Sequence, residues 1–188
     1  MADFFYKNVI IYQSPDEQSN LRQELKKVKD LEGDIIEVGV FQGGSAGIMR
    51  EELEGVPMYL FDTFTGFADE LHESDFKGYK VGHCATDESF VTELFKDEKD
   101  VHIVKGVFPK TSKIVEDKKF RFAIIDVDIY NPTLNSLNFI FPRMVKGGII
   151  YVHDYPAHPG VKLACDEWLK DKNLEIWNPM SRQLFIYV

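Results

Sequence analysis

The feature that most constrains the fold is a regular alternation of short apolar runs with helix-like stretches. The apolar runs are nearly continuous, which is typical of strands buried on both faces of a parallel sheet. They predict strands at residues 34–40, 58–62, 101–105, 120–128 and 147–154. Amphipathic or helix-like patterns predict helices at residues 15–31, 45–53, 132–144 and 160–170. Strands that alternate with helices indicate an α/β fold with helices on both faces of the sheet.

Two further apolar runs close the sequence, at residues 174–177 and 183–188. We expect them to form a C-terminal antiparallel hairpin. The complete expectation is therefore a seven-stranded, mostly parallel sheet.

Acidic side chains and one histidine lie where four of the predicted strands end. In chain order they are Glu37, Asp62, Asp126, Asp128, His153 and Asp154. Ligands of open α/β sheets bind beyond the carboxyl ends of the strands, so these side chains are expected to share one rim of the sheet. Aspartate is a common turn former, and any one of them alone has a structural explanation. Their coincidence favours a functional site.

The loop after the first predicted strand is rich in glycine, reading Glu-Val-Gly-Val-Phe-Gln-Gly-Gly-Ser over residues 37–45. It is not the GxGxxG of dinucleotide enzymes, because Phe41 and the spacing differ, and it lacks the ending of a phosphate-binding P-loop. Glycine lets a backbone approach a ligand, and the following helix N-terminus suits a carboxylate or phosphate. Ser45 either bonds such a carboxylate or caps the helix. Since Asp62 lies where an acid typically binds ribose hydroxyls, the loop predicts an adenosine-containing ligand.

Charge and composition argue against several classes of function. Lysine and arginine number 22 and aspartate and glutamate 31, a formal net charge of −9. No nucleic-acid or membrane partner is expected of so acidic a chain. The two cysteines, Cys84 and Cys165, do not make a disulfide framework, and no signal peptide or membrane span is apparent. A cytoplasmic setting is therefore expected.

Five motifs occur in a fixed order between residues 33 and 169. They occupy residues 37–46, 61–67, 105–109, 125–133 and 147–155. Together they resemble the macrocin O-methyltransferase family of class I S-adenosylmethionine enzymes, and more distantly the metal-dependent catechol O-methyltransferases. The resemblance implies a Rossmann-like class I methyltransferase fold with S-adenosyl-L-methionine as cofactor.

The resemblance also implies which residues hold the cofactor. Glu37 would take its ammonium group, Ser45 with nearby backbone N–H groups its carboxylate, and Asp62 its ribose hydroxyls. Residues 106–107 would lie near the adenine, and Phe108 is either a wall of that pocket or a core aromatic. The full set of expected cofactor-binding residues is Glu37, Gly39, Val40, Phe41, Gly43, Ser45, Asp62, Gly106, Val107 and Asp126.

A divalent cation, Mg²⁺ or alternatively Mn²⁺, is implied in the same way. Its ligands map to Asp128, His153 and Asp154, with Asp126 as an alternative ligand. Magnesium prefers hard oxygen ligands, whereas imidazole suits manganese, iron or zinc better. His153 is therefore a ligand, a base, a partner of a ligand or a purely structural residue.

The reaction implied by the resemblance is methyl transfer to a hydroxyl of a sugar or glycosylated small molecule. In-line displacement at the sulfonium methyl depends on positioning, and a sugar hydroxyl needs a base. Catechol-type enzymes place a lysine shortly after the first aspartate of this strand, but here Ile129 and Tyr130 follow Asp128. Asp128 is the expected catalytic base, with His153 second.

Two other classes of function remain open on the sequence. One is an inactive adenosylmethionine-binding regulator or assembly partner, which the intact Asp126, Asp128 and Asp154 argue against, because a non-catalytic binder has no need of them. The other is a nucleotide-sugar or NAD enzyme, which the missing GxGxxG pattern argues against.

A single domain, residues 1–188, accounts for the chain, with residues 1–32 as an N-terminal extension and helix and residues 33–188 as the catalytic core. Residues 67–90 are polar and long for a simple connection, which is typical of a lid or binding loop. Three histidines in the rim loops are candidates to meet the acceptor: His72, His83 and His158. Aromatic residues near the start are candidates to cover an edge of the domain or a partner subunit in a homodimer: Phe4, Phe5, Tyr6 and Tyr12.

Overall fold

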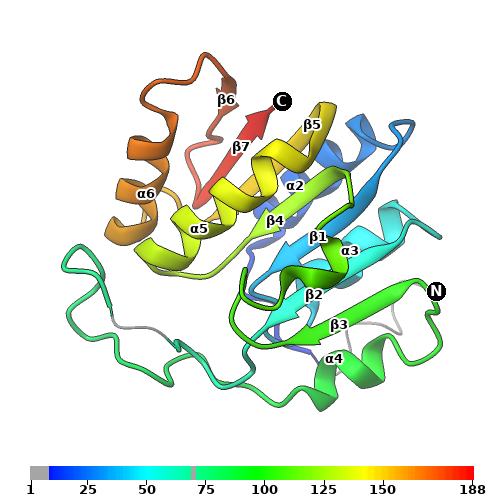
Figure 1. Cartoon of the computed structure of the whole chain (residues 1–188), viewed down its shortest axis with the longest axis horizontal. Coiled ribbons are helices and arrows are strands. Elements are labelled where there is room, and N and C mark those ends of the chain that lie inside the picture. Colours follow the sequence, from blue (N-terminus) through cyan, green and yellow to red (C-terminus); the bar gives the residue numbers. More distant parts are fainter. Residues whose placement is uncertain (1–8, 69–70) are drawn as a thin grey trace.

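A computed structural model of the chain describes residues 9–68 and 71–188, which form a seven-stranded sheet between two layers of helices (Figure 1). The strand order is β3-β2-β1-β4-β5-β7-β6. Phe4, Phe5 and Tyr6 lie outside the described residues. Within the described ranges, no helix combines the length and the apolar character that crossing a membrane requires.

Five strands are parallel and the last two are antiparallel. The parallel strands are β1 (Asp34–Val38), β2 (Met58–Asp62), β3 (Val101–Lys105), β4 (Phe120–Ile125) and β5 (Met144–His153). β7 (Gln183–Tyr187) pairs antiparallel with both β5 and β6 (Glu175–Trp177). The predicted seven-stranded sheet with its C-terminal antiparallel hairpin is confirmed.

Alternate residues of the central strands face opposite helix layers. Ile35 and Phe122 pack in one apolar core, whereas Ile36 and Ala123 pack in the other, as the two-residue repeat of a strand requires. The first core is covered by α2 (Pro15–Lys27), α3 (Gly44–Glu52) and α4 (Ser89–Leu94), and the second by α5 (Tyr130–Ile140) and α6 (Pro159–Leu169). Helices therefore cover both faces, as predicted.

Several boundaries differ from those predicted. β4 ends at Ile125 and not at residue 128, and Asp128 has a left-handed backbone conformation (φ +63°) that a strand does not accommodate. α5 gives way to a 3₁₀ turn, η2 (Phe141–Arg143), where Pro142 lacks the N–H that a longer α-helix needs. β5 starts at Met144, three residues before the predicted start at Gly147. The short helix α4 lies where the sequence predicts no helix.

The strand order reverses beside β1, which pairs with β2 on one side and β4 on the other. The connections that leave these strands run in opposite directions and open a crevice at their carboxyl ends, where open α/β sheets bind ligands. The fold thus places the predicted rim of acidic side chains at the switch point.

Candidate active site

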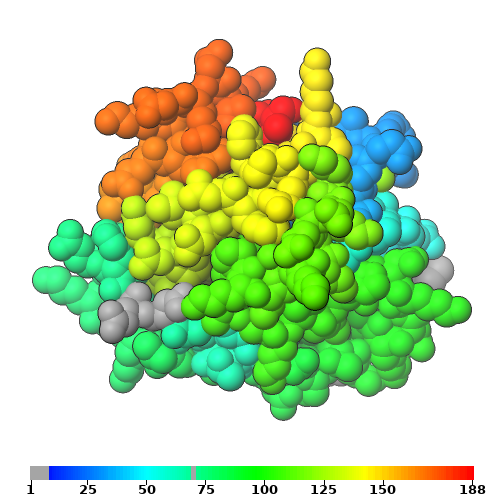
Figure 2. Space-filling model, viewed as in Figure 1, coloured from blue at the N-terminus to red at the C-terminus, as the bar shows by residue number. Residues whose placement is uncertain are grey.

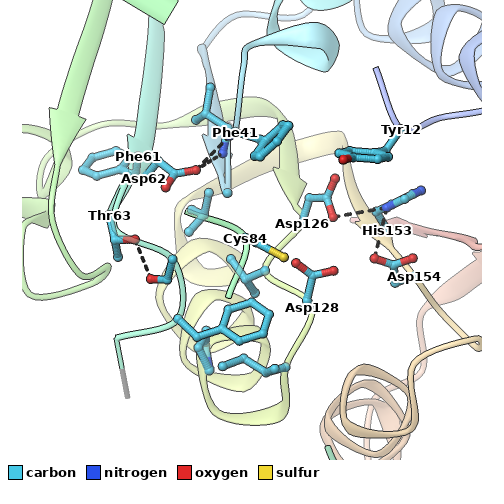
Figure 3. Close-up of a pocket in the computed structure, with 18 of the residues that line it drawn as sticks. Tyr12, Phe41, Phe61, Asp62, Thr63, Cys84, Asp126, Asp128, His153 and Asp154 are labelled. Carbon is cyan, nitrogen blue, oxygen red and sulfur yellow. Dashed lines mark hydrogen bonds and ion pairs between the residues drawn. The ribbon is translucent and has the colours of Figure 1, made fainter. Parts of the chain in front are cut away.

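A cavity of about 500 Å³ lies beyond the carboxyl ends of β1, β2, β4 and β5. Its wall includes Asp62, Asp126, Asp128, His153 and Asp154, which Figure 3 shows around the opening. The side chains that follow separate strands therefore do share one rim.

The glycine loop after β1 is held by the acid at the end of β2. One oxygen of Asp62, Oδ2, accepts hydrogen bonds from the backbone N–H groups of Val40 (2.7 Å) and Phe41 (2.8 Å) (Figure 3), and Oδ1 accepts from Phe64 N (2.7 Å). Asp62 thus shapes the loop, a role that sequence reasoning missed. Each carboxylate oxygen has two lone pairs, so a further bond to a ribose hydroxyl stays available to Oδ1 and the ribose role stays a prediction.

Gly39 brings the glycine loop into contact with the end of β4. Its φ is +87°, and a Cβ atom built there would lie 1.8 Å from the carbonyl oxygen of Asp126. No residue with a side chain fits without moving one of these backbones. Gly43, with φ +87°, is the N-cap of α3 and carries no side-chain cap.

Glu37 is a fully buried carboxylate beside the cavity. Ser45, which lines the cavity, donates its hydroxyl to Glu37 Oε1, so Ser45 does not cap α3 with its side chain. The other oxygen, Oε2, is buried and has no hydrogen-bond partner among the described residues. Burial raises the pKa of Glu37 well above its ordinary value, and the charges of Asp126 and Asp62 add to this effect, against the hydrogen bond from Ser45.

The donors expected to bind a cation form two overlapping groups. Asp126, His153 and Asp154 make one, with His153 Nδ1 3.1 Å from Asp126 Oδ1 and 3.3 Å from Asp154 Oδ2. Asp128, Asp154 and His158 make the other, with His158 Nε2 3.5 Å from Asp154 Oδ1. His153 therefore groups with Asp126 and not with Asp128, and His158 takes the place beside Asp128 that the sequence suggested for His153.

Crowding of carboxylates perturbs the acid–base behaviour of these groups. Burial raises the pKa of Asp128 well above its ordinary value, and the charges of Asp126 and Asp154 act in the same direction. Burial alone would raise the pKa of Asp154 too, but His153 and His158 hold it at about 2. Burial alone would lower the pKa of His153, yet the neighbouring carboxylates raise it well above its usual value. Asp128, whose raised pKa favours the protonated form, thus lies beside Asp154, whose carboxylate stays ionised.

The residues that the sequence analysis expects near the adenine also line the cavity. Gly106 (φ +135°), Val107 and Phe108 line the cavity after β3. Phe108 is buried and its ring packs 4.9 Å from that of Phe61, centroid to centroid. Phe108 is thus a core aromatic that is at the same time part of the wall.

Three further residues of the cavity wall are not predicted from the sequence to lie there: Tyr12, Gln13 and Arg182. Arg182, from the β6–β7 connection, lies with Nη1 3.4 Å from Asp154 Oδ1, and its Nη2 donates to the backbone carbonyl of Tyr12. Gln13 is buried and its Oε1 has no partner among the described residues. Tyr12, expected at a domain edge or subunit contact, stacks obliquely on Phe41 at the cavity. Nothing in the local pattern around Arg182 or Gln13 marks them, because their proximity depends on the tertiary fold.

Of the candidate rim histidines, His83 and His158 line the cavity and His72 does not. His72 instead stacks on Tyr130, with ring centroids 4.1 Å apart. Cys84, for which the sequence predicts no functional role, lines the cavity beside Asp128 (Figure 3).

A parallel sheet with an antiparallel C-terminal pair, a glycine loop after β1 and an acid at the end of β2 together define a Rossmann-like, class I methyltransferase fold. The family model described as macrocin-O-methyltransferase (TylF) matches residues 17–182, and the chain belongs to this family.

Two curated relatives and one solved structure show the range of similarity. Demethyldecarbamoylnovobiocin O-methyltransferase of Streptomyces niveus is 26% identical over 167 residues, which cover 79% of this chain and 63% of the relative. A Streptomyces olivaceus enzyme, 8-demethyl-8-(2,3-dimethoxy-alpha-L-rhamnosyl)-tetracenomycin-C 4'-O-methyltransferase, is 25% identical over 144 residues, 65% of this chain and 53% of that protein. The chain thus spans less than two thirds of either relative. The crystal structure of CalS11, a calicheamicin methyltransferase, superposes with a TM-score of 0.75 at 24% identity, covering 93% of this chain and 80% of that one.

Proposed function

We propose that this chain transfers the methyl group of S-adenosyl-L-methionine to a hydroxyl of a sugar or glycosylated small molecule. The observation that carries the proposal is one cavity in which a glycine loop, backed by the buried Glu37 carboxylate with its unpartnered Oε2, adjoins the carboxylates of Asp126, Asp128 and Asp154. The glycine loop with Glu37 suits a cationic methyl donor, and the three carboxylates suit a hydroxyl acceptor bound through a metal ion.

The residues of the loop fit the methyl donor. The buried Glu37 Oε2 lacks a hydrogen-bond donor, and an ammonium group would supply one. Ser45 and the N-terminus of α3 would hold the carboxylate, Asp62 the ribose, and residues 106–108 the adenine. The remaining members of the expected set, Gly39, Val40, Phe41, Gly43 and Asp126, would shape or line this part of the cavity.

The donors of the rim fit a divalent cation. Asp154 Oδ1 and His153 Nε2 are buried and accept or donate no hydrogen bond within the described chain, although Arg182 Nη1 forms an ion pair with Asp154 Oδ1 at 3.4 Å. Asp154, which belongs to both donor groups, would hold the ion, with Asp126 and His153 completing one group and Asp128 and His158 the other. The mixture of carboxylate and imidazole suits Mn²⁺ as well as Mg²⁺. Such an ion orients an acceptor oxygen and lowers its pKa.

Asp128 is the proposed base. Its raised pKa gives it the proton affinity that a general base needs, and its position on the wall exposes it to an acceptor, whereas Asp154 is held ionised. His153, fixed by two carboxylates, is the second candidate and would orient Asp126 and Asp154.

The acceptor class is supported by the relatives, since the Streptomyces olivaceus enzyme is named for a substrate that carries a rhamnosyl group. A hydroxyl acceptor with no sugar would contradict this part of the proposal. A panel of methyl glycosides, nucleotide sugars and catechols, assayed with S-adenosyl-L-methionine with and without Mg²⁺ or Mn²⁺, tests it.

The variant Asp128→Asn tests the base. Turnover on the best acceptor of the panel is expected to fall by about 10²-fold or more, while the Kd for S-adenosylhomocysteine changes by less than about two-fold. Near-normal turnover in this variant would remove Asp128 from the role. Cation binding is measured separately, by calorimetric titration of the cofactor-free protein with Mn²⁺, and unchanged affinity in Asp154→Asn would exclude Asp154, the residue shared by both donor groups, as a ligand.

The proposal extends to the organisation of the chain. Residues 33–188 would form the catalytic core, residues 1–32 an N-terminal extension, and residues 67–90 a lid over the acceptor. A homodimer is also proposed, with the exposed faces of Ile10 and Tyr12, which border the cavity mouth, at the contact between subunits. Sedimentation at several concentrations distinguishes it from a monomer.

A further inference from the structure

The segment of residues 71–85 leaves the cavity wall, crosses to the helices of the opposite layer and returns to the wall at His83 and Cys84 (Figure 1). Figure 2 shows it as a projection at the left edge of the molecule, beside the surface of α5 and α6. Its neck is closed by backbone hydrogen bonds from Phe67 N to His83 O (3.0 Å) and from Gly82 N to Phe67 O (2.9 Å). The middle of the segment, by contrast, depends on a side chain.

Asp75 is that side chain, and it is buried. Its Oδ1 accepts a hydrogen bond from the backbone N–H of Tyr130 (2.9 Å), the first residue of α5, and its Oδ2 accepts from His72 N (2.8 Å). The N-cap residue of α5 is Ile129, which has no side-chain hydrogen bond to offer. Asp75 therefore caps α5 from a distant part of the chain.

Gly160, in the first turn of α6, leaves room for this carboxylate. A Cβ atom built at Gly160 would lie 1.8 Å from Asp75 Oδ1 and 3.0 Å from Asp75 Cγ. His72, in the same segment, adds a second contact to α5, because its ring stacks on that of Tyr130 with centroids 4.1 Å apart. Two helices and the segment thus meet at a single carboxylate.

The docked segment reaches the cavity through Tyr79. The Tyr79 hydroxyl lies 3.4 Å from His158 Nδ1, and His158 contacts both Asp128 and Asp154. Tyr79 also packs against Phe67 and His83, which line the cavity. A segment released from α5 would therefore lose the support of the acceptor-side wall.

We propose that Asp75 is a positioning residue that docks residues 71–85 onto the N-terminal ends of α5 and α6 and thereby holds the acceptor side of the cavity in place. The docking stands on its own contacts, whereas the statement that the wall faces an acceptor rests on the proposed function. The consequence is a separation of effects: loss of docking impairs acceptor binding and spares the methyl donor, whose proposed contacts lie at the carboxyl ends of β1–β4, away from the docked segment.

Five variants test the docking: Asp75→Ala, Asp75→Asn, Gly160→Ala, the double variant Asp75→Ala/Gly160→Ala, and Glu73→Ala as a matched control at an exposed acid in the same segment. Trypsin cleavage after the exposed Lys77 and Lys80, followed by mass spectrometry, reports the undocked population, and alkylation of Cys84 reports the wall. Asp75→Ala and Gly160→Ala are each expected to speed both reactions by roughly ten-fold, with Glu73→Ala at the wild-type rate.

The double variant decides whether the two residues act through one contact. Once the carboxylate is absent, the closest obstacle to a Cβ atom at residue 160 is gone, and Tyr130 N, at 3.0 Å, remains near it. The double variant is therefore expected to lie close to Asp75→Ala, well below the product of the two single effects. Asp75→Asn keeps an acceptor for Tyr130 N and is expected to recover part of the protection. Multiplicative effects, or wild-type rates in Asp75→Ala, would overturn the proposal.

The effect of docking on acceptor binding is measured separately, as the KM for methyl α-L-rhamnopyranoside. Asp75→Ala is expected to raise its KM by about ten-fold, leaving the Kd for S-adenosylhomocysteine within about two-fold of wild type. Equal loss of donor and acceptor affinity would refute the positioning role. A wild-type protein that binds no S-adenosylhomocysteine would instead refute the proposed function, and the cleavage and alkylation results would still decide the docking.

Discussion

Asp128 and Asp154 hold left-handed backbone conformations, each with φ +63°, at the ends of neighbouring strands. Such a conformation costs a residue with a side chain on the order of 1 kcal/mol or more and persists only where the surroundings impose it, often at functional sites. Asparagine tolerates this region as well as aspartate does. Asp128→Asn therefore removes a charge without opposing the backbone, which makes it a suitable substitution for the test of the base.

Glu37 provides the sharpest prediction at the scale of the residue. Glu37→Gln keeps an acceptor for Ser45 and removes the charge that would meet an ammonium group. The Kd for S-adenosylhomocysteine, measured by calorimetry, is expected to rise by about 10- to 100-fold. Glu54→Gln, a change at an exposed acid, serves as the control and is expected to bind normally.

The pH dependence of stability follows from the same residue. Burial raises the folded-state pKa of Glu37 above its ordinary value of 4.5, so its contribution is fully present below pH 4.5 and is lost as the pH rises through the folded pKa. The free energy of unfolding of wild type minus that of Glu37→Gln is expected to fall over this window, by about 1.4 kcal/mol per unit of pKa shift. Urea titrations of both proteins at a series of pH values measure it, and a difference that is flat with pH would contradict the assignment.

At this scale the sequence predicts which acids gather on the rim but not how they pair. The position of each acid after an apolar run identifies Asp62, Asp126, Asp128 and Asp154, because parallel strands end at the same edge. The pairing of His153 with Asp126, and of His158 with Asp128, depends on side-chain directions in two loops that carry no periodic pattern. The same is true of the two backbone hydrogen bonds that occupy Asp62 Oδ2.

At the scale of elements, helix α2 begins with a capping box. Ser14 Oγ accepts a hydrogen bond from Glu17 N (3.3 Å), and Glu17 Oε2 accepts from Ser14 N (2.8 Å), with Pro15 at the first helical position. Glu17 is buried, and its other oxygen accepts from Arg182 N (3.3 Å). The start of α2 is thereby tied to the connection that carries Arg182 into the cavity.

Removing the cap has a measurable cost. Ser14→Ala is expected to lower the free energy of unfolding by about 1 kcal/mol, since it leaves a backbone donor of the first turn unpaired. Ser19→Ala, an exposed position inside the same helix, is expected to be neutral or slightly stabilising, because alanine is the better helix former. Chemical denaturation of the two variants compares them, and equal losses would show that the capping box contributes nothing.

The sequence predicts all seven strands. Buried strands such as β1, β2, β4, β5 and β7 leave nearly continuous apolar runs, and the shorter, more exposed β3 and β6 still stand out as apolar runs between polar segments. It does not predict α4, which has only six residues and buries Val91 as its one fully enclosed side chain. Nor does it predict the docking of Asp75, whose partner Tyr130 is 55 residues away. Contacts of this kind leave no local periodicity.

At the scale of the whole molecule, the ligand cavity and both apolar cores share the same central strands. Ligand binding that favours the folded state therefore stabilises the entire sheet. S-adenosylhomocysteine at about 100 times its Kd is expected to raise Tm by roughly 5–10 °C, the shift that about 2.7 kcal/mol produces in a chain of this size. Differential scanning calorimetry with NAD at the same concentration is the control. A shift with NAD and none with S-adenosylhomocysteine would favour the dinucleotide alternative.

The absence of a side chain at Gly39 has a consequence for how the acceptor preference of this cavity can change during evolution. Because the backbone of the glycine loop touches the carbonyl of Asp126 directly, the gap between the proposed donor and acceptor halves is set by main-chain atoms. Displacing a reacting group by about 1 Å can cost 10²-fold in rate. Substitutions in the outer loops can therefore change which acceptor enters while leaving the transfer distance untouched, so new substrate preferences can arise without rebuilding the reaction centre.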